Sequence, residues 1–468
     1  RESVRPSSGS GSPPNRNLML AAIASATLLN PLNSSMISVA LSRINHDFGI
    51  TFAQGSWIVS AFYLASAIAQ PLMGRLSDTY GRKRVFLSGL VISAAASMLA
   101  PLSPTFGWLV GFRVLQAAGT SALFPSGAAM IRGHITERQA AALGVLAVCS
   151  STSAAFGPTI GGYLVHYGDW PLVFLVNFPF ILFSLTLGWR ILPQDPGRPE
   201  GVRRNLKREL SGLDPAGILL FAACVVGALV FLLSLRGEAD LFAGGVALAA
   251  AILFYLRERS ARNPFLDLRG SLAHREVISV YLQFVLVNVV YYSSFIGMPT
   301  YLQDARHIPA DTTGTMMLAL AGSGVVLTPL AARLIDRTGP KPGIVFAALC
   351  MLAGSILLFT VPARGGIPHL ILALVVLGSA GGFNNLGLQT ALYGFVPQEE
   401  VGSASGLFQT SRYLGTILST SLLGVEFASG VDTPHLHTVA LGMAAVAALA
   451  LLLALLMRNP GPPEKQQT

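Results

Sequence analysis

One arginine lies inside a stretch that otherwise suits a lipid bilayer. Arg113 occurs in the apolar run 106–131, about two helical turns from its start, so a membrane-crossing helix would hold it roughly 10 Å deep. A guanidinium stays charged at all physiological pH values, and an uncompensated one in hydrocarbon costs at least about 2.5 to 3.5 kcal/mol. Arg412 in the run 401–427 poses the same problem. Each arginine must therefore be satisfied by amide oxygens, backbone carbonyls, water or a bound anion.

The sequence offers amides but no carboxylate at mid-membrane depth. All 22 Asp and Glu residues fall in tails, connections or the ends of apolar runs. Asn33 lies roughly 12 Å from the end of the run 18–41, at a depth similar to that of Arg113. We expect the Asn33 carbonyl to be the first acceptor for Arg113. The other members of this predicted central polar region are Asn30, Ser34 and Gln116.

Composition assigns the chain to a membrane. Of 468 residues, 52% are hydrophobic and only 11% charged, whereas a soluble domain carries about 25% charged residues. Fourteen apolar runs can each cross about 30 Å of hydrocarbon. They are 18–41, 56–76, 85–102, 106–131, 138–163, 170–192, 213–235, 240–256, 277–302, 313–335, 342–361, 367–393, 401–427 and 438–457. Hydropathy alone also fits twelve or thirteen spans, because the run 240–256 is short.

Basic residues set the orientation. With the N-terminal end inside, 25 of the 31 Lys and Arg residues fall on the cytoplasmic side and four on the other, so both termini are expected in the cytoplasm. The first run has no small-residue cleavage site after it, and we expect it to be retained. The net charge of +9 is explained by these connections and by lipid headgroups, so no nucleic-acid partner is expected.

The sequence gives little support for disulfide bonds, a metal site or the use of ATP. Cys149, Cys224 and Cys350 are isolated within apolar runs, which argues against a disulfide framework or a metal site. No phosphate-binding or nucleophile motif occurs in a connection, so ATP use within the chain is disfavoured.

A short motif occurs twice. "GRLSDTYGRKR" (74–84) follows the second run and "ARLIDRTGPK" (332–341) follows the tenth, sharing R-L-x-D-x-x-G-x-K, with Asp78 matching Asp336. If the runs 213–235 and 240–256 are set aside, each copy follows the second helix of a six-helix half. A tight cytoplasmic turn that merely collects Gly and basic residues would leave this shared register unexplained.

At these residues the chain resembles the major facilitator superfamily, whose transporters work between two related halves. "GRLSDTYGRKR" is similar to that family's loop motif, and "WPLVFLVNFP" (170–179) and the inserted pair resemble its fourteen-helix drug:proton antiporters. The resemblance implies an all-α fold of six, two inserted and six helices. It casts the motif residues as a cytoplasmic gate: Gly74, Asp78, Gly81, Arg82, Arg84 and Asp336.

The expected organisation divides the chain into seven parts. They are a disordered tail (1–17), an N-terminal bundle (18–192), a basic linker (193–212), the inserted pair (213–256), a second linker (257–276), a C-terminal bundle (277–457) and a tail (458–468). Asp214 and Pro215 form a good N-cap and first turn for the inserted pair.

Two further motifs carry the resemblance into the helices. "GPTIGG" (157–162) is similar to a motif of the superfamily's exporters, and its Gly157, Pro158, Gly161 and Gly162 favour close helix packing and a hinge. "RVLQAAG" (113–119) corresponds to a motif whose Arg is implicated in proton coupling. "LNSSMISVAL" (32–41) corresponds to one that normally holds an Asp, in place of which stands Asn33. Arg113 either ties helices together or belongs to the transport site.

Polar and aromatic side chains in other runs predict a substrate cavity, because such groups are costly when they face lipid. Holding helices together is the alternative for each. The candidates are Tyr63, Tyr281, Asn288, Tyr291, Tyr292, Asn384, Asn385, Gln389, Gln409, Arg412 and Tyr413.

The resemblance implies a monomeric exporter of small amphiphilic compounds in the inner membrane, surrounded by lipid and driven by the proton gradient without a bound cofactor or metal. Asn33 cannot carry a proton, so an exporter of lipid or an anionic metabolite without coupling at this site is the nearest rival. A membrane enzyme or a receptor is the rival of another class. Neutral or anionic amphiphiles are expected to be favoured over quaternary ammonium compounds, since the cavity would be net positive.

Overall fold

The computed structural model describes residues 16–134, 139–195, 214–234, 240–261, 264, 274–363, 365–397 and 401–460. The predicted tails and both linkers lie largely outside this part. Its elements are α1 (Arg16–Thr27), α2 (Leu29–Phe48), α3 (Phe52–Gly55), α4 (Trp57–Tyr80), α5 (Arg82–Leu99), η1 (Ala100–Leu102), α6 (Phe106–Ser121), α7 (Leu123–His134), α8 (Gln139–Gly168), α9 (Pro171–Leu175), α10 (Asn177–Ile191), α12 (Pro215–Ser234), α13 (Leu241–Ser260), α15 (Arg275–Thr300), η2 (Tyr301–Ala305), α16 (Ala310–Met316), α17 (Leu318–Thr338), α18 (Pro340–Phe359), α19 (Ile367–Phe395), α20 (Val401–Glu426), η4 (Phe427–Ser429) and α21 (Thr433–Leu456).

Each of the fourteen apolar runs is mainly helical where it is described, and these elements include no strand. Within the described residues, twelve helical spans are long and apolar enough to cross a membrane. The 30-residue α8 and the 26-residue α20 are not among these twelve. The all-helical membrane fold is confirmed, whereas the number fourteen stays a prediction.

Prolines explain several bends within the spans. Leu28, Ala122 and Val176 each separate two helices while keeping right-handed helical dihedral angles. Each lies three residues before a proline: Pro31, Pro125 and Pro179. Proline cannot donate the helical hydrogen bond, and its ring collides with the carbonyl four residues earlier, so the helix bends there without ending.

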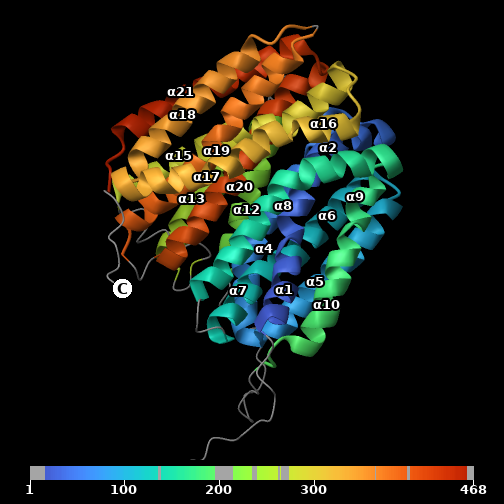
Figure 1. The fold of residues 1–468 in the computed structure, drawn as a ribbon, viewed down its shortest axis with the longest axis vertical. Helices are drawn as coiled ribbons and strands as arrows, with labels where there is room; N and C mark the ends of the chain where they lie inside the picture. The colour runs from blue at the N-terminus through green and yellow to red at the C-terminus, as the bar shows by residue number, and fades with distance from the viewer. Residues whose placement is uncertain are drawn as a thin grey trace, which may run out of the picture.

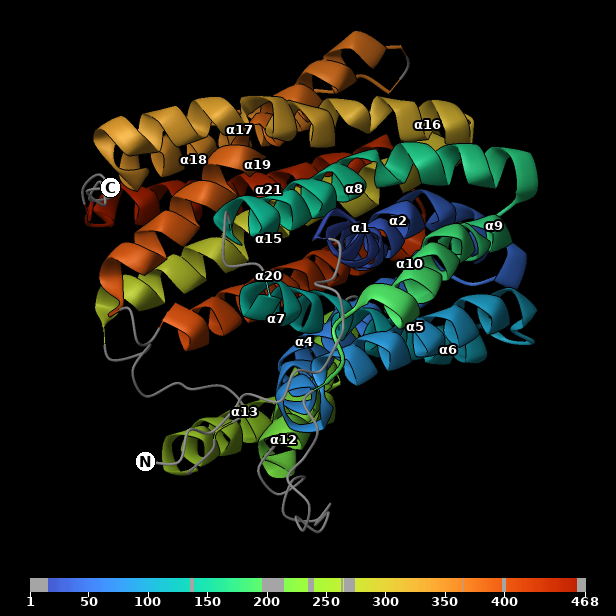
Figure 2. The ribbon, with the colours of Figure 1, turned by 60° about the horizontal axis from the view of Figure 1, so that its bottom comes forward.

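The helices form two bundles that meet along a seam. Helices α1 to α10 make one bundle and helices α15 to α21 the other, and the two are seen in Figure 1 as the blue-to-green and yellow-to-red groups. Helix α8 of the first bundle packs against α16 and α17 of the second, while α4 packs against α20. Figure 2 also shows α8 and α16 side by side. Residues facing the seam can therefore respond to movement between the bundles.

The inserted pair forms its own hairpin. Helices α12 and α13 pack on each other, and α12 also contacts α20 and α4, on opposite sides of the seam (Figure 2). The predicted cap is present, since the Gly217 amide donates to Asp214 Oδ1 at 3.2 Å. Arg257, at the end of α13, donates from Nε and a terminal nitrogen to the same oxygen at 3.1 and 3.0 Å. The charged pair thus closes the hairpin at one end.

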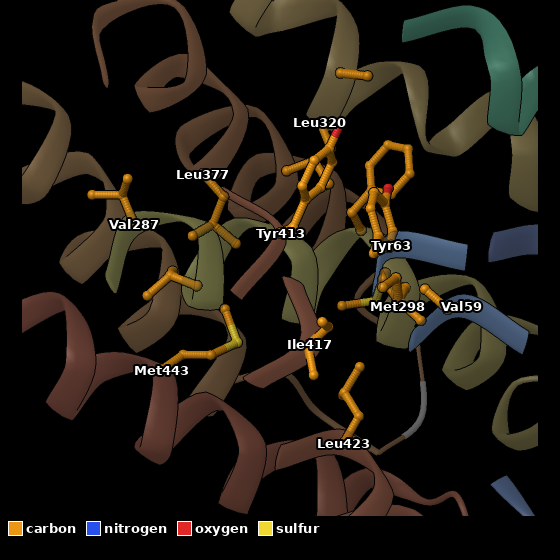
Figure 3. Packing of buried hydrophobic residues seen from close by; sticks show 14 of the residues in the cluster. Val59, Tyr63, Val287, Met298, Leu320, Leu377, Tyr413, Ile417, Leu423 and Met443 are labelled. Atoms are coloured by element: carbon orange, nitrogen blue, oxygen red, sulfur yellow. The ribbon is translucent and has the colours of Figure 1, made fainter. Parts of the chain in front are cut away.

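A continuous apolar core joins the bundles. It includes Val59 and Tyr63 of α4 together with Met298 of α15 and Ile417 of α20, and Figure 3 shows these side chains close together. The core is therefore shared across the seam, and movement of one bundle against the other must rearrange it.

Candidate functional site

Arg113 is enclosed in a network of neutral polar groups. Its side chain is only 1% exposed. One terminal nitrogen donates to Gln116 Oε1 at 2.6 Å, and the other lies 3.5 Å from the backbone oxygen of Asn33. Gln116 Nε2 in turn donates to Asn33 Oδ1 at 3.1 Å. The structure thus brings Arg113, Gln116 and Asn33 together as predicted, although the Asn33 side chain reaches Arg113 only through Gln116.

Two residues that the sequence reasoning did not single out complete the network. Asn177 of α10 donates to Asn33 Oδ1 at 2.7 Å, and Gln116 donates to Ser97 Oγ of α5 at 2.9 Å. Both are buried, Ser97 and Asn177 at 0% exposure. Asn177 stands in the "WPLVFLVNFP" motif, where a lone amide among apolar residues was the available signal. The network therefore joins four helices, α2, α5, α6 and α10.

Two aromatic rings lie next to the Arg113 guanidinium, whose charge the amides do not neutralise. The guanidinium carbon of Arg113 lies 4.2 Å from the centre of the Phe62 ring and 5.9 Å from that of Phe174. A cation over a ring face is attracted by about 2 kcal/mol or more when desolvated. Arg113 Nε has no hydrogen-bond partner among the described residues. Among the residues that the structure describes, this arrangement holds a positive charge in place without an ion pair to a carboxylate.

The flanking polar positions on α2 are less central. Asn30 Nδ2 donates to Thr120 Oγ1 of α6 at 3.1 Å, so it links the same two helices one turn away from the network. Ser34 donates to the Pro31 carbonyl of its own helix at 3.0 Å. Neither contacts Arg113, and the structure places them beside the network.

Arg412 has a different environment. Its side chain is half-buried on α20, and one terminal nitrogen donates to Asn385 Oδ1 of α19 at 3.0 Å. Its guanidinium carbon lies 5.5 Å from the centre of the Phe284 ring of α15, and that ring stacks on Phe408. No ion pair to Arg412 occurs in the described part of the chain. One amide and one ring therefore hold this second membrane arginine.

A tyrosine cluster lies at the seam. Tyr63 of α4 has its ring centre 5.8 Å from that of Tyr292 and 5.7 Å from that of Tyr413. Figure 3 shows the Tyr63 and Tyr413 side chains near each other. Tyr291 joins Tyr292 at 5.5 Å. The Tyr413 hydroxyl donates to Gln70 Oε1 of α4 at 2.9 Å. We call Tyr63, Tyr291, Tyr292 and Tyr413 the tyrosine cluster; it brings four predicted cavity residues from both bundles into contact.

The remaining predicted cavity residues are not gathered at one place. Tyr281 donates to the Ala404 carbonyl, and Asn288 donates to the carbonyl of Phe284 in its own helix. The buried Asn384 donates to Met351 Sδ at 3.5 Å. Gln389 donates to Tyr393, and no contact of Gln409 is described. Tyr281 and Asn384 thus join helices of the second bundle, whereas Asn288 bonds within α15.

The repeated loop motif makes contacts within its own bundle. Gly81 has a φ of +105°, and a Cβ there would lie 2.3 Å from the Asp195 carboxylate. The Asp195 oxygens accept from the backbone amides of Lys83 and Arg84, so Asp195 satisfies the start of α5. The sequence reasoning placed Asp195 in a linker and missed this role.

The other predicted gate residues do not form one cluster in the described part of the chain. Arg82 donates to the Ala129 carbonyl at 2.9 Å, and Gly74 faces Pro125 of α7. The side chain of Asp78 lies outside the described residues. Asp336 is exposed at the end of α17. The gate role of this motif stays a prediction.

The "GPTIGG" segment packs α8 against two helices at once. Gly157 and Gly161 face Ser35 and Met36 of α2 within the first bundle. Gly162 faces Ala310 of α16 in the second bundle, where a Cβ would lie 2.2 Å from the Ala310 carbonyl oxygen. Pro158 lies within the helix. Only glycine permits this approach of α8 to α16, so the motif is part of the seam.

Polar contacts cross the seam at this same end of the molecule. His46 Nε2 lies 3.5 Å from Asp304, which also accepts from Ser42, and His166 Nδ1 lies 3.6 Å from Asp311. Thr159 donates to the Gly314 carbonyl. The loop motif at the other end makes its described hydrogen bonds within its own bundle. The seam is therefore closed at the end where α8 meets α16.

Comparison with known proteins identifies the family. The family model described as Major Facilitator Superfamily matches residues 23–420. The chain belongs to the major facilitator superfamily. It is therefore a multi-span membrane transporter and not an enzyme. Among the described residues, no group of three His, Cys, Asp or Glu side chains could hold a metal ion.

Relatives and solved structures extend this result. An uncharacterized MFS-type transporter of Bacillus subtilis (strain 168), YwoD, is 43% identical over 441 residues, which cover 94% of this chain and 96% of that protein. The tetracenomycin C resistance and export protein of Streptomyces glaucescens is 29% identical, over 88% and 76% of the two chains. A bacterial homologue of the human lysosomal transporter Spinster, in an inward-facing and unoccupied conformation, has a TM-score of 0.67 at 16% identity, over 96% and 98% of the two chains. The last similarity concerns the fold alone.

Proposed function

We propose that this transporter exports small amphiphilic compounds by alternating access between its two bundles. The observation that carries the proposal is the tyrosine cluster, in which rings from α4, α15 and α20 meet at the seam. A mixed aromatic and polar lining suits apolar compounds with few fixed hydrogen-bonding groups. Drug-resistance and export proteins among the relatives support the same substrate class.

The proposed topology has fourteen spans, with α8 and α20 added to the twelve apolar ones, and both termini in the cytoplasm. The inner membrane of a bacterium is the proposed location, and the chain is proposed to act as a monomer surrounded by lipid. In this orientation the end closed by α8 and α16 is external. The conformation described would then be inward-facing, ready to take a substrate from the cytoplasm or the inner leaflet.

Energy is proposed to come from the proton gradient, by antiport and without a bound cofactor. The hydrogen-bond network around Asn33 and Arg113 contains amides, a hydroxyl and a guanidinium. None of these groups binds and releases a proton at neutral pH. The proton carrier of an antiporter must then lie elsewhere in the chain. The network supplies fixed positive charge and joins the helices that move.

A second candidate follows from the same network. An exporter of lipid or of an anionic metabolite, uncoupled from protons at the first-helix site, would need no carboxylate beside Arg113. The absence of a carboxylate from the hydrogen bonds of Arg113 and Asn33 favours this alternative.

Transport by the purified chain tests the proposal. Proteoliposomes that contain the chain are given a fluorescent amphiphile outside, and its entry into the lumen is followed against protein-free liposomes. Export requires faster, saturable entry that a second amphiphile inhibits. Entry at the protein-free rate for neutral, anionic and cationic amphiphiles alike would contradict the proposal.

A further inference from the structure

Arg412 is the less enclosed of the two membrane arginines. Arg113 is 1% exposed and has both terminal nitrogens near oxygen acceptors, whereas Arg412 is half-buried and has one described hydrogen bond, to Asn385. A guanidinium carries five N–H donors. Several donors of Arg412 are therefore available to a further acceptor, and a charged acceptor would be bound most strongly.

Neighbouring side chains fix the guanidinium without neutralising it. Asn385 accepts from one terminal nitrogen, and the Phe284 ring lies 5.5 Å from the guanidinium carbon. Phe284 is itself held by Phe408, with parallel rings 3.7 Å apart. An amide and a ring leave the full positive charge in place. The site is thus pre-organised for an anion, which reduces the ordering cost of binding.

A polar stripe leads from Arg412 to the end of the bundle. Asn385, Gln389 and Tyr393 follow one another at four-residue spacing on one face of α19. Gln389 donates to the Tyr393 hydroxyl at 3.0 Å, and that hydroxyl lies 3.0 Å from Ser405 Oγ of α20. Asn385 and Tyr393 are exposed. Polar groups facing hydrocarbon are costly, so this stripe fits a water-accessible path better than a lipid-facing surface.

The tyrosine cluster adjoins the arginine. Tyr413 follows Arg412 in α20, and the Tyr291 ring lies beside Gly381 of α19, one turn before Asn385, since a Cβ at Gly381 would be 3.8 Å from that ring. A molecule bound between them could place an anionic group on Arg412 and an apolar body on the rings.

We propose that Arg412, positioned by Asn385 and Phe284, binds the carboxylate or sulfonate group of an anionic amphiphile that enters along the α19 stripe. This inference rests on the proposed export of amphiphiles and specifies their charge. Arg113 does not serve as this site, because it is 1% exposed and is enclosed by amides and by the rings of Phe62 and Phe174. An aromatic carboxylate is the fitting substrate class, since a phospholipid phosphate would leave the tyrosine cluster unused.

Three probes with one naphthalene ring test the proposal: 1-naphthoate, 1-naphthylmethanol and 1-naphthylmethylammonium. Binding to the purified full chain in a neutral detergent is measured for the wild type and for Arg412→Gln, Arg412→Lys and Arg190→Gln. Arg190 is exposed at the end of α10 and controls for loss of one positive charge. Arg412→Gln should raise the dissociation constant of naphthoate at least about tenfold and that of naphthylmethanol less than about twofold.

The other variants sharpen the result. Arg412→Lys should weaken naphthoate binding less, because a lysine keeps the charge but loses the forked donors. Arg190→Gln should change neither probe. Binding of naphthylmethanol also shows that Arg412→Gln is folded. Equal loss of the anionic and the neutral probe, or no loss of either, would overturn the proposal.

Two more outcomes separate this inference from the proposed function. If the wild type binds and transports the neutral or cationic probe but not naphthoate, export stands and the anionic assignment is wrong. If it binds and transports none of the three, both are wrong. Loss of Arg412-dependent naphthoate binding on adding phosphatidylglycerol would assign the position to a lipid phosphate and overturn the substrate assignment.

Discussion

The two membrane arginines show two ways of keeping a positive charge in an apolar protein. Arg113 is sealed among α2, α4, α6 and α9, with amide oxygens and two aromatic rings around it. Arg412 has one amide and one ring and is half-buried. The difference separates a charge that is part of the internal packing from a charge that an incoming ligand can reach.

The comparison also explains why no carboxylate is needed at either position. A buried ion pair loses solvation on both partners, whereas amides and ring faces satisfy a guanidinium without a second desolvated charge. The uncompensated charge then remains as a fixed positive potential. In a transporter, such a potential repels cations and attracts anions wherever water or substrate can enter.

Replacing Arg113 should have the largest effect. In Arg113→Met, transport should fall about 10- to 150-fold, because hydrogen bonds worth about 1.5 to 3 kcal/mol no longer position α2 and α6 during the cycle. The free energy of unfolding should change by less than about 1 kcal/mol, because removal of a buried charge offsets most of the lost bonding. Transport assays and thermal unfolding of the same preparation measure both. Unchanged transport would reduce Arg113 to a packing residue.

Adding a methyl group at the seam should have the second largest effect. In Gly162→Ala the new Cβ would meet the Ala310 backbone, and overpacking of this kind costs about 1 to 3 kcal/mol. The conformation in which α8 packs against α16 should become less populated. Spin labels at Tyr167→Cys and Thr312→Cys report the separation by pulsed electron paramagnetic resonance. Gly322→Ala, which meets no atom within 4 Å, is the control and should leave the distance unchanged. Identical distance distributions in both variants would contradict the role given to the motif.

Removing one amide from each region contrasts the two sites directly. Asn177→Ala leaves Asn33 Oδ1 with one donor fewer at 0% exposure, and it should lower the free energy of unfolding by about 1 to 3 kcal/mol. Asn385→Ala should lower it by less than about 0.5 kcal/mol, because Arg412 is accessible to water. Thermal unfolding of the two variants decides the matter. Equal losses would show that both arginines are packed alike.

The exposed ion pair between Arg43 and Asp169 is a reference for the two membrane arginines and should have the smallest effect. Arg43 donates from two nitrogens to the carboxylate of Asp169, and these hydrogen bonds hold the pKa of Asp169 below its usual 3.8. A lowered carboxyl pKa adds stability that is present above the unfolded pKa and is lost as the pH falls through the folded pKa. Arg43→Gln should therefore cost about 0.2 to 1 kcal/mol at neutral pH and nothing once the pH is below both values. Unfolding at several pH values in two salt concentrations measures this, and an equal cost at all pH values would contradict it.

Much of the fold could be predicted because a bilayer demands long apolar helices. The apolar runs, the superfamily and the nearness of Arg113 to Asn33 were visible in residue types and depths, whereas Gln116 was expected only somewhere in the same polar region. The ends of the helices were less predictable. Hydropathy falls at the first charged residue, while backbone hydrogen bonds continue, as in α13, which runs to Ser260, four residues beyond the predicted end.

Other long-range contacts could not be predicted from one sequence. Asn177 and Asp195 act on residues 144 and 112 positions away, and nothing in their local sequence names the partner. The predicted cavity set had the same weakness: Asn288 and Asn384 were chosen for polarity, but the structure uses them to bond within the second bundle. A polar side chain in a membrane helix is expected to point into the protein, but its polarity does not show which other residues share its site.

Proton movement in proteoliposomes tests the central claim most directly. A pH-sensitive dye inside reports the lumen, which is made acidic, and an amphiphile is added outside to the wild type and to Asn33→Asp. The account predicts that the wild type raises the luminal pH as the amphiphile enters, since antiport moves protons outward. Amphiphile entry without any change of luminal pH in the wild type, alongside a clear change in Asn33→Asp, would contradict it and would show that this chain works without the proton gradient.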